Sequence, residues 1–421
     1  MTPKFNFYSF WKSILYVFQG QVFAQLIPLI SYVVIARLID AKFFGLFAIW
    51  FGVAKILSIM STLRLETSLV NEPDGNKRDE AVFNVIVTSS LTSLLFIVVT
   101  IIFYKLNIVD FLANLSLLAW ALLVPFAFML ACDITLQTWA AADGRYKDLN
   151  KIRLIQSSSI AIFQVTLVYL YRDTNALIIG ASLGCLFGIC LSQFLHPLGI
   201  YFNKNFPLKL KDFWLKHQRF PIYSLPADTV SSFIAQLPVL IVGSRFGLEI
   251  AGQLALTLRM MAAPVALLGR AVQDVFKRQA ALDFINLGNC KKLYEKTFYI
   301  LLPGGLIFIA LTVSIGEQMF ILFFGDQWQK AGQFAVWLSP NFALGFIASP
   351  LSYIVYIVNR QNVDLFWQLT LMIVVFVTLL LPSEIFITLV AYSIGYSFMY
   401  IIYIAITYRL SLGNIKNKSD N

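Results

Sequence analysis

Charged residues are scarce in this sequence. Asp, Glu, Lys and Arg make up only 13% of its 421 residues, whereas 59% of the residues are hydrophobic. A soluble globular domain usually has charged groups at about a quarter of its positions, because its surface must face water. The scarcity of charge therefore excludes a soluble enzyme or binding domain, and it indicates a polytopic membrane protein.

Residues that hold metals or form disulfides are also few. The only two histidines, His196 and His217, lie in or beside one connection, and the four cysteines have the spacing of neither a metal site nor a disulfide framework. No G-x-x-x-x-G-K-[ST] motif occurs, which argues against ATP hydrolysis by this chain. We therefore expect no cofactor, no metal and no enzymatic activity.

Long apolar segments are what the sequence has in abundance. Twelve of them are long enough to cross a bilayer as helices. The first begins close to the N-terminus and lacks a small-residue cleavage site, so it is read as a retained helix and not as a signal peptide. The twelve segments are 13–38, 43–65, 82–104, 114–140, 152–171, 175–200, 221–244, 251–276, 297–324, 333–358, 363–382 and 384–408.

The positive charges alternate along the chain. Both termini and every second connection together hold 23 of the 32 Lys and Arg residues, whereas the opposite connections hold six. Because Lys and Arg collect on the cytoplasmic side of membrane proteins, both termini are predicted to be cytoplasmic. The net charge of +10 is explained in the same way, so it does not indicate a nucleic-acid partner.

The longest cytoplasmic connection divides the predicted helices into six and six. Pro28, Arg37, Asp40 and the run 44–48 in the first half are echoed by Pro238, Arg245, Glu249 and the run 251–255 in the second half. Both copies enter from the same side, as in the parallel repeats of alternating-access transporters. We therefore expect an all-α membrane protein with about twelve transmembrane helices in two six-helix lobes around a central cavity. The predicted parts are 1–200, 201–219 and 220–421.

Three cations fall inside apolar segments. Arg259 lies eight residues, about 12 Å, beyond Ala251, and Lys55 lies eleven residues, about 16 Å, beyond Phe44. A cation at this depth is costly unless it faces a polar cavity or a partner, so the two either share an anion site or form structural ion pairs. Arg270 lies three turns after Arg259 on the same face, nearer the membrane edge, where it either joins that site or extends to the interface.

Three acids accompany these cations. Asp133 and Asp274 are close to the predicted cytoplasmic face, where interfacial charges are ordinary. Asp228 lies about 10 Å into its helix, so it either pairs with Arg259 or Arg270 or serves as a protonation or cation site.

Polar side chains also mark the first two helices. Gln21 and Gln25 share one face of the first helix, where amides either line a polar route or bond to neighbouring helices. Arg64 and Glu66 close the second helix, and a local ion pair is expected between them.

Several stretches resemble one known family. The sequence is similar to the polysaccharide transporter family of the multidrug/oligosaccharidyl-lipid/polysaccharide exporter superfamily, whose members are flippases of bacterial O-antigen and exopolysaccharide synthesis. Related flippases of lipid-linked peptidoglycan precursors carry cations in a central cavity, on helices that correspond to those of Lys55 and Arg259. Those relatives have arginines in the first helix, where this chain has Gln21 and Gln25. The matching stretches are 35–40, 44–48, 64–70, 220–226, 236–240, 324–332 and 348–352.

The resemblance implies a substrate class. We expect a flippase that moves an undecaprenyl-pyrophosphate-linked oligosaccharide, an O-antigen or exopolysaccharide repeat unit, across the bacterial inner membrane by alternating access. The expected partners are this lipid-linked glycan, the bilayer, and polysaccharide polymerase and chain-length proteins. Two alternatives remain. A cation-coupled multidrug exporter would favour acidic residues at mid-membrane, and a polysaccharide polymerase or ligase would need a large outward loop.

Overall fold

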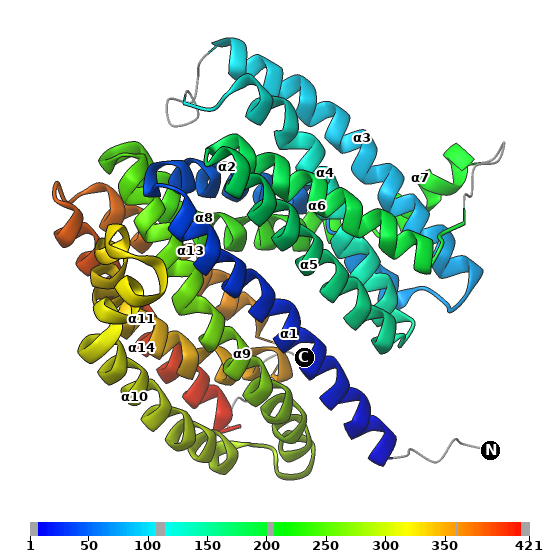
Figure 1. Ribbon diagram of the computed structural model, residues 1–421. Helices are drawn as coiled ribbons and strands as arrows, with labels where there is room; N and C mark the ends of the chain where they lie inside the picture. The colour runs from blue at the N-terminus through cyan, green and yellow to red at the C-terminus, as the bar shows by residue number, and fades with distance from the viewer. Residues whose placement is uncertain (1–6, 107–113, 200–205, 359, 414–421) are drawn as a thin grey trace. The chain divides into compact units, whose positions relative to one another are not determined.

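The fold is described from a computed structural model of the chain. It describes residues 7–106, 114–199, 206–358 and 360–413, and for residues 7–21, 270, 271 and 274 it describes the backbone alone. The chain forms two compact units, Met1–Gln236 and Leu237–Asn421, and the division falls within α8 (Leu225–Phe246). All regular elements in the described ranges are helical, which confirms the expected all-α fold (Figure 1).

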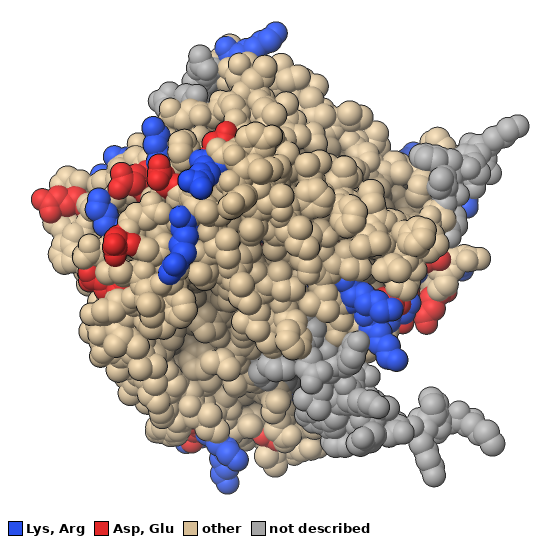
Figure 2. All heavy atoms as spheres, viewed as in Figure 1, with Lys and Arg blue, Asp and Glu red and all other residues tan. Residues whose placement is uncertain are grey.

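Eleven helices among the described residues are long and apolar enough to cross a membrane. A shorter apolar stretch, Val22–Leu38, belongs to α1, which begins at Phe7. Uncharged side chains cover most of the surface visible in Figure 2. These spans establish a multi-pass membrane protein, in which the backbone hydrogen bonds are satisfied within each helix.

The N-terminal unit contains seven complete helices and the first half of α8. Its most extensive contact joins α5 to α6 through glycines spaced four residues apart, Gly180, Gly184 and Gly188. A Cβ atom at Gly184 would lie 2.5 Å from the Cα atom of Ile160, so only glycine permits this approach. The helices are α1 (Phe7–Leu38), α2 (Ala41–Ser61), α3 (Asn76–Leu106), α4 (Leu117–Ala142), α5 (Tyr146–Tyr171), α6 (Thr174–Leu195) and α7 (Phe206–Lys216).

The C-terminal unit is organised around α11, which packs against α9, α10 and α14. The buried Gln253 of α9 donates to the Gln327 carbonyl at 2.6 Å and accepts from the Ala331 amide at 2.9 Å. Gly325, with φ 102°, makes the turn that brings α10 back into α11. The helices are α9 (Leu248–Leu287), α10 (Lys291–Phe324), α11 (Gln329–Leu351), α12 (Ile354–Ile357), α13 (Gln361–Leu380) and α14 (Ile385–Ser411).

One end of the N-terminal unit is rich in basic side chains, and we call it the basic end. There α2, α4 and α6 end, α3 and α5 begin, and α7 lies beside α3. The buried Arg78 fastens this end: its guanidinium donates to the carbonyls of Leu69 and Glu72 and pairs with Asp143 at 2.5 Å. Each of these bonds joins α3 to a neighbouring segment, so the loops of the basic end are held in place.

The amphipathic helix α7 is attached to the basic end through Glu72. The Glu72 Oε1 atom lies 2.5 Å from both Lys216 Nζ and His217 Nε2, and both Glu72 and His217 are buried. Burial by itself raises the pKa of Glu72, but the hydrogen bonds and charges of Lys216 and His217 outweigh it. The pKa of this carboxyl therefore lies below its ordinary value of 4.5.

This pKa gives a prediction for stability. Because the folded pKa is lowered, the contribution of Glu72 is fully present above pH 4.5 and is lost as the pH falls through the lower folded value. Glu72→Gln is expected to cost about 1.5–3 kcal/mol at pH 7. The difference in melting temperature between the two proteins should shrink below pH 4.5, measured on purified protein in detergent.

Glu80→Gln is the matched control. Glu80 of α3 pairs with Lys209 of α7, the helix that also contains Lys216, at a more exposed site. It should have a smaller effect at every pH. If the difference in melting temperature between Glu72→Gln and the natural chain stayed constant down to pH 3.5, this contact would not favour the charged form of Glu72.

Candidate functional site

Lys55 is the cation inside a membrane span of the N-terminal unit. It lies on α2, six residues or about 9 Å before the last helical residue, Ser61. Its side chain is exposed on the surface of the unit. Lys55 is therefore closer to the basic end of α2 than to the other end, and its charge is available to a ligand.

A carboxylate on α4 lies within the field of Lys55. The positive charges of Lys55 and of Arg153, on α5, both act on Asp133. The Oδ2 atom of Asp133 accepts a hydrogen bond of 2.9 Å from Gln137 Nε2, one turn further along α4. The Oε1 atom of Gln137 in turn accepts one of 3.2 Å from Arg153 Nε. The Gln137 amide thus lies between a carboxylate and a guanidinium and links α4 to α5.

These four residues form one group, which we call the Lys55 cluster: Lys55, Asp133, Gln137 and Arg153. Asp133 lies nine residues before the end of α4, and Arg153 lies seven residues after the start of α5, so both are about 10–13 Å from the basic end. All three helices are candidate membrane spans. The cluster therefore places two cations and one carboxylate at similar depths in three helices.

Two members of this cluster are not among the site residues predicted from the sequence. From the sequence, Arg153 was counted among the cations of a cytoplasmic connection. In the structure α5 begins at Tyr146, which places Arg153 seven residues into the helix. Gln137 gave no signal of its own. The sequence did hold one clue to Arg153: Arg153 and Gln156 are three residues apart and so share one face of the predicted helix. Gln156 is buried and donates to the Cys185 sulfur of α6 at 2.9 Å.

Arg259 occupies the C-terminal unit. It is half-buried on α9, eleven residues or about 16 Å after Leu248. Gln253 and Thr257 face α11, since the Thr257 hydroxyl donates to the Ala331 carbonyl at 2.8 Å. Two residues further is a rotation of about 200° on a helix, so Arg259 lies on the side of α9 away from α11. Its side chain is thus not used for this helix contact.

The remaining predicted site residues differ in what the structure says of them. The side chains of Gln21, Arg270 and Asp274 lie outside the described residues. Gln25 is half-buried on α1, and its Oε1 atom is buried without a hydrogen bond from the part of the chain that the structure describes. Gln25 therefore offers an acceptor, whereas the cluster on α2, α4 and α5 offers charge.

Asp228 has a partner that the sequence did not indicate. Its Oδ2 atom lies 2.6 Å from Arg64 Nε, and Arg64 Nη1 also lies 2.8 Å from Glu66 Oε1. The pair of Arg64 with Glu66 was expected. Leu63 and Arg64 both have positive φ, 52° and 58°, a conformation that costs about 1–2 kcal/mol per residue outside glycine. This turn directs Arg64 toward the first turns of α8.

The pairing joins the stretch 64–70, which carries part of the family resemblance, to a residue just after another such stretch, 220–226. The second stretch contains a π-helical turn, Phe220–Ser224, just before α8. Such turns inside helices often occur at functional positions. The ion pair therefore fastens the beginning of α8 to the end of α2.

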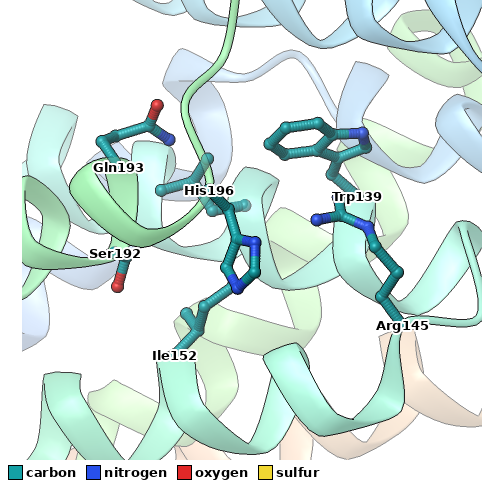
Figure 3. Close-up of a pocket in the computed structure, with 7 residues that line it drawn as sticks. Trp139, Arg145, Ile152, Ser192, Gln193 and His196 are labelled. Atoms are coloured by element: carbon teal, nitrogen blue, oxygen red, sulfur yellow. The ribbon is translucent and has the colours of Figure 1, made fainter.

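A small pocket opens where α4, α5 and α6 meet the basic end (Figure 3). In it the Arg145 guanidinium lies 4.4 Å from the centre of the Trp139 ring and pairs with Asp143 at 3.0 Å. His196 Nε2 lies 3.0 Å from Asp148 Oδ1. Arg145 pairs with Asp143 and His196 contacts Asp148, so the pocket fastens three helix ends and is not the candidate site.

The C-terminal unit carries an aromatic row that ends at a carboxylate. Asp364 of α13 accepts hydrogen bonds from Tyr403 at 2.5 Å and from Gln368 at 2.9 Å. Tyrosine rings follow one another along α14, and the centroids of the Tyr396 and Tyr400 rings are 5.1 Å apart. The sequence analysis did not single out this row, although four tyrosines on one face of a predicted helix could have indicated it. The row consists of Tyr392, Tyr396, Tyr400, Tyr403 and Trp367.

Comparison with known proteins places this fold. A family described as "Polysaccharide biosynthesis protein" matches residues 34–333. No curated protein sequence matches the chain.

Solved structures share the fold at low identity. A lipid II flippase MurJ in an inward closed conformation is 17% identical, with a TM-score of 0.68 over 94% of this chain and 87% of that one. An inward-facing multidrug resistance MATE family transporter is 13% identical, with a TM-score of 0.65 over 94% and 96%. An outward-facing MATE transporter has a TM-score of 0.57 at 13% identity, over 96% and 97%.

The Arg64 contacts predict an order of stabilities. Arg64→Gln leaves the buried Glu66 carboxylate without its cation, which is expected to cost about 3–5 kcal/mol. Asp228→Asn leaves Arg64 still paired with Glu66, and the Asp228 side chain is 40% exposed, so about 1 kcal/mol or less is expected. Thermal unfolding of the purified variants measures both.

The double change Arg64→Gln with Glu66→Gln serves as the internal control. It should recover part of the loss of Arg64→Gln, because the buried charge is removed. Equal losses for Asp228→Asn and Arg64→Gln would contradict this order.

Proposed function

Because the chain belongs to the polysaccharide biosynthesis protein family, we propose that it is a flippase for a lipid-linked glycan. The proposed cargo is an undecaprenyl-pyrophosphate-linked oligosaccharide, an O-antigen or exopolysaccharide repeat unit. It moves from the cytoplasmic to the periplasmic leaflet of the bacterial inner membrane. Both termini and the basic end face the cytoplasm in this proposal.

The observation that carries the proposal is the Lys55 cluster. A pyrophosphate that leaves water loses solvation, and only fixed positive charge and hydrogen-bond donors can replace it. Lys55 offers an exposed ammonium and Arg153 a guanidinium, within membrane spans of one compact unit. A guanidinium binds phosphate oxygens with two parallel donors, whereas an ammonium acts as a compact charge.

The second unit adds support of the same kind. Arg259 is half-buried on the side of α9 that does not bind α11. Each unit thus presents a cation from one of its long spans, α2 in the N-terminal unit and α9 in the C-terminal unit. A cationic drug would be repelled by both, so an anionic cargo fits these helices better.

The shared fold supports a transport function. The lipid II flippase has this fold and moves, as its name says, a lipid. Inward-facing and outward-facing structures of transporters with the same fold make alternating access the proposed mechanism. An inside-negative potential favours outward movement of the anionic cargo by about 2.3 kcal/mol per charge per 100 mV. Polysaccharide polymerase and chain-length proteins are proposed partners that receive the product.

Substitutions at the two cations test this function. Lys55→Ala and Arg259→Ala are each expected to abolish most glycan export, because the pyrophosphate loses a counter-charge. Arg259→Lys should retain part of the activity, and Arg259→Glu should be the most damaging because it repels the cargo. Surface glycan is measured in cells that carry each variant as their only copy, with immunoblots of membrane fractions.

Lys42→Ala is the matched control, because Lys42 is an exposed cation at the opposite end of α2. It should leave export near normal. Normal export by Lys55→Ala and Arg259→Ala at normal abundance would refute the proposal. Sensitivity to cationic dyes with intact surface glycan, after deletion of the chain, would favour a drug exporter instead.

A further inference from the structure

Asp133 is an anion placed beside the cations of the candidate site. We propose that Asp133 is the resident counter-ion of Lys55 and Arg153, and that the pyrophosphate of the cargo displaces it during transport. Arg153 is then a cargo-binding residue alongside Lys55. This inference rests on the proposed function, because it concerns the same anion and the same cluster.

The geometry of the cluster suits an exchange of partners. Asp133 and Gln137 lie on α4, Lys55 on α2 and Arg153 on α5, and α4 packs against both other helices. The Gln137 amide donates to Asp133 and accepts from Arg153, so the carboxylate is linked to the guanidinium through a neutral group. Phosphate oxygens can replace the neutral Gln137 oxygen as the acceptor at Arg153 Nε.

The charges require some anion in this place. Two cations inside the apolar part of a membrane protein are costly when they have no negative partner. Asp133 supplies one negative charge within reach of both cations. A carboxylate that competes with the cargo also weakens its binding, and a transport site must bind weakly enough to release. Asp133 therefore limits how tightly the site binds the pyrophosphate of the cargo.

A purely structural counter-ion predicts the opposite effect of its removal. If Asp133 only stabilises the fold, Asp133→Asn lowers stability and does not improve binding. If Asp133 competes with the cargo, Asp133→Asn binds pyrophosphate more tightly than the natural chain does. The direction of the affinity change thus separates the two roles.

The test measures binding to the purified full-length chain in detergent by calorimetry. The probes are geranylgeranyl pyrophosphate and inorganic pyrophosphate, with geranylgeraniol as the probe that lacks the anion. Asp133→Asn is expected to bind both pyrophosphates about tenfold more tightly. Arg153→Ala should weaken binding about tenfold, and Arg153→Lys should weaken it less. Geranylgeraniol binding should be the same for all variants.

Controls of equal charge change are available on neighbouring surfaces. Lys151→Ala removes an exposed cation two residues before Arg153, and Asp212→Asn removes an exposed anion of α7. Neither should change pyrophosphate affinity by more than about twofold.

The outcomes distinguish this inference from the function on which it rests. If the natural chain binds no pyrophosphate, or Lys55→Ala binds it equally well, the proposed function fails. If binding depends on Lys55 but Asp133→Asn binds equally or less tightly, only the displacement by cargo is overturned. Asp133→Ser is the second variant, and failure of both to fold would show a structural carboxylate and would also overturn the inference.

Discussion

The cost of holding charge inside an apolar segment is the constraint on which this structure depends. With 13% charged residues in the whole chain, each charge away from the membrane edge needs a partner or a use. At the basic end the charges satisfy one another: Arg78 with Asp143, Glu72 with Lys216. Deeper in the same unit, the Lys55 cluster brings together two cations and one carboxylate. In the proposed function these cations serve the anionic cargo.

Rigid and adjustable contacts lie in different places. The glycines of α6 allow α5 to approach so closely that Gly184 tolerates no side chain. These two helices therefore form a rigidly packed pair. The Gln253 hydrogen bonds do the same for α9 and α11. By contrast, Arg64 reaches Asp228 from a strained turn, and Asp228 follows a π-helical turn at the start of α8. The contact of α2 with α8 thus rests on a strained turn, whereas the contacts of α5 with α6 and of α9 with α11 are closely packed.

Much of the fold could be predicted from the sequence, because helix length and apolarity are local properties. The all-α membrane fold and membership in the polysaccharide transporter family are confirmed. Lys55 was found by its depth in an apolar run. Arg153 was not singled out, because it closely follows three other cations, Arg145, Lys147 and Lys151, and only the helix bounds show that it lies seven residues into α5. The pairing of Asp228 with Arg64 joins positions 164 residues apart, which a single sequence does not reveal. Gln137 has a role only through its two neighbours in space.

The most direct test of the account is transport by the purified chain in sealed vesicles. A fluorescent polyprenyl-pyrophosphate disaccharide is placed in both leaflets, and its exposure is followed with a membrane-impermeant oxidant of sugars, without ATP. The protected fraction should be lost rapidly with the natural chain, faster when the potential drives anions toward the oxidant, and slowly with Lys55→Ala. Equal rates in protein-free vesicles and in vesicles that contain the natural chain would contradict it.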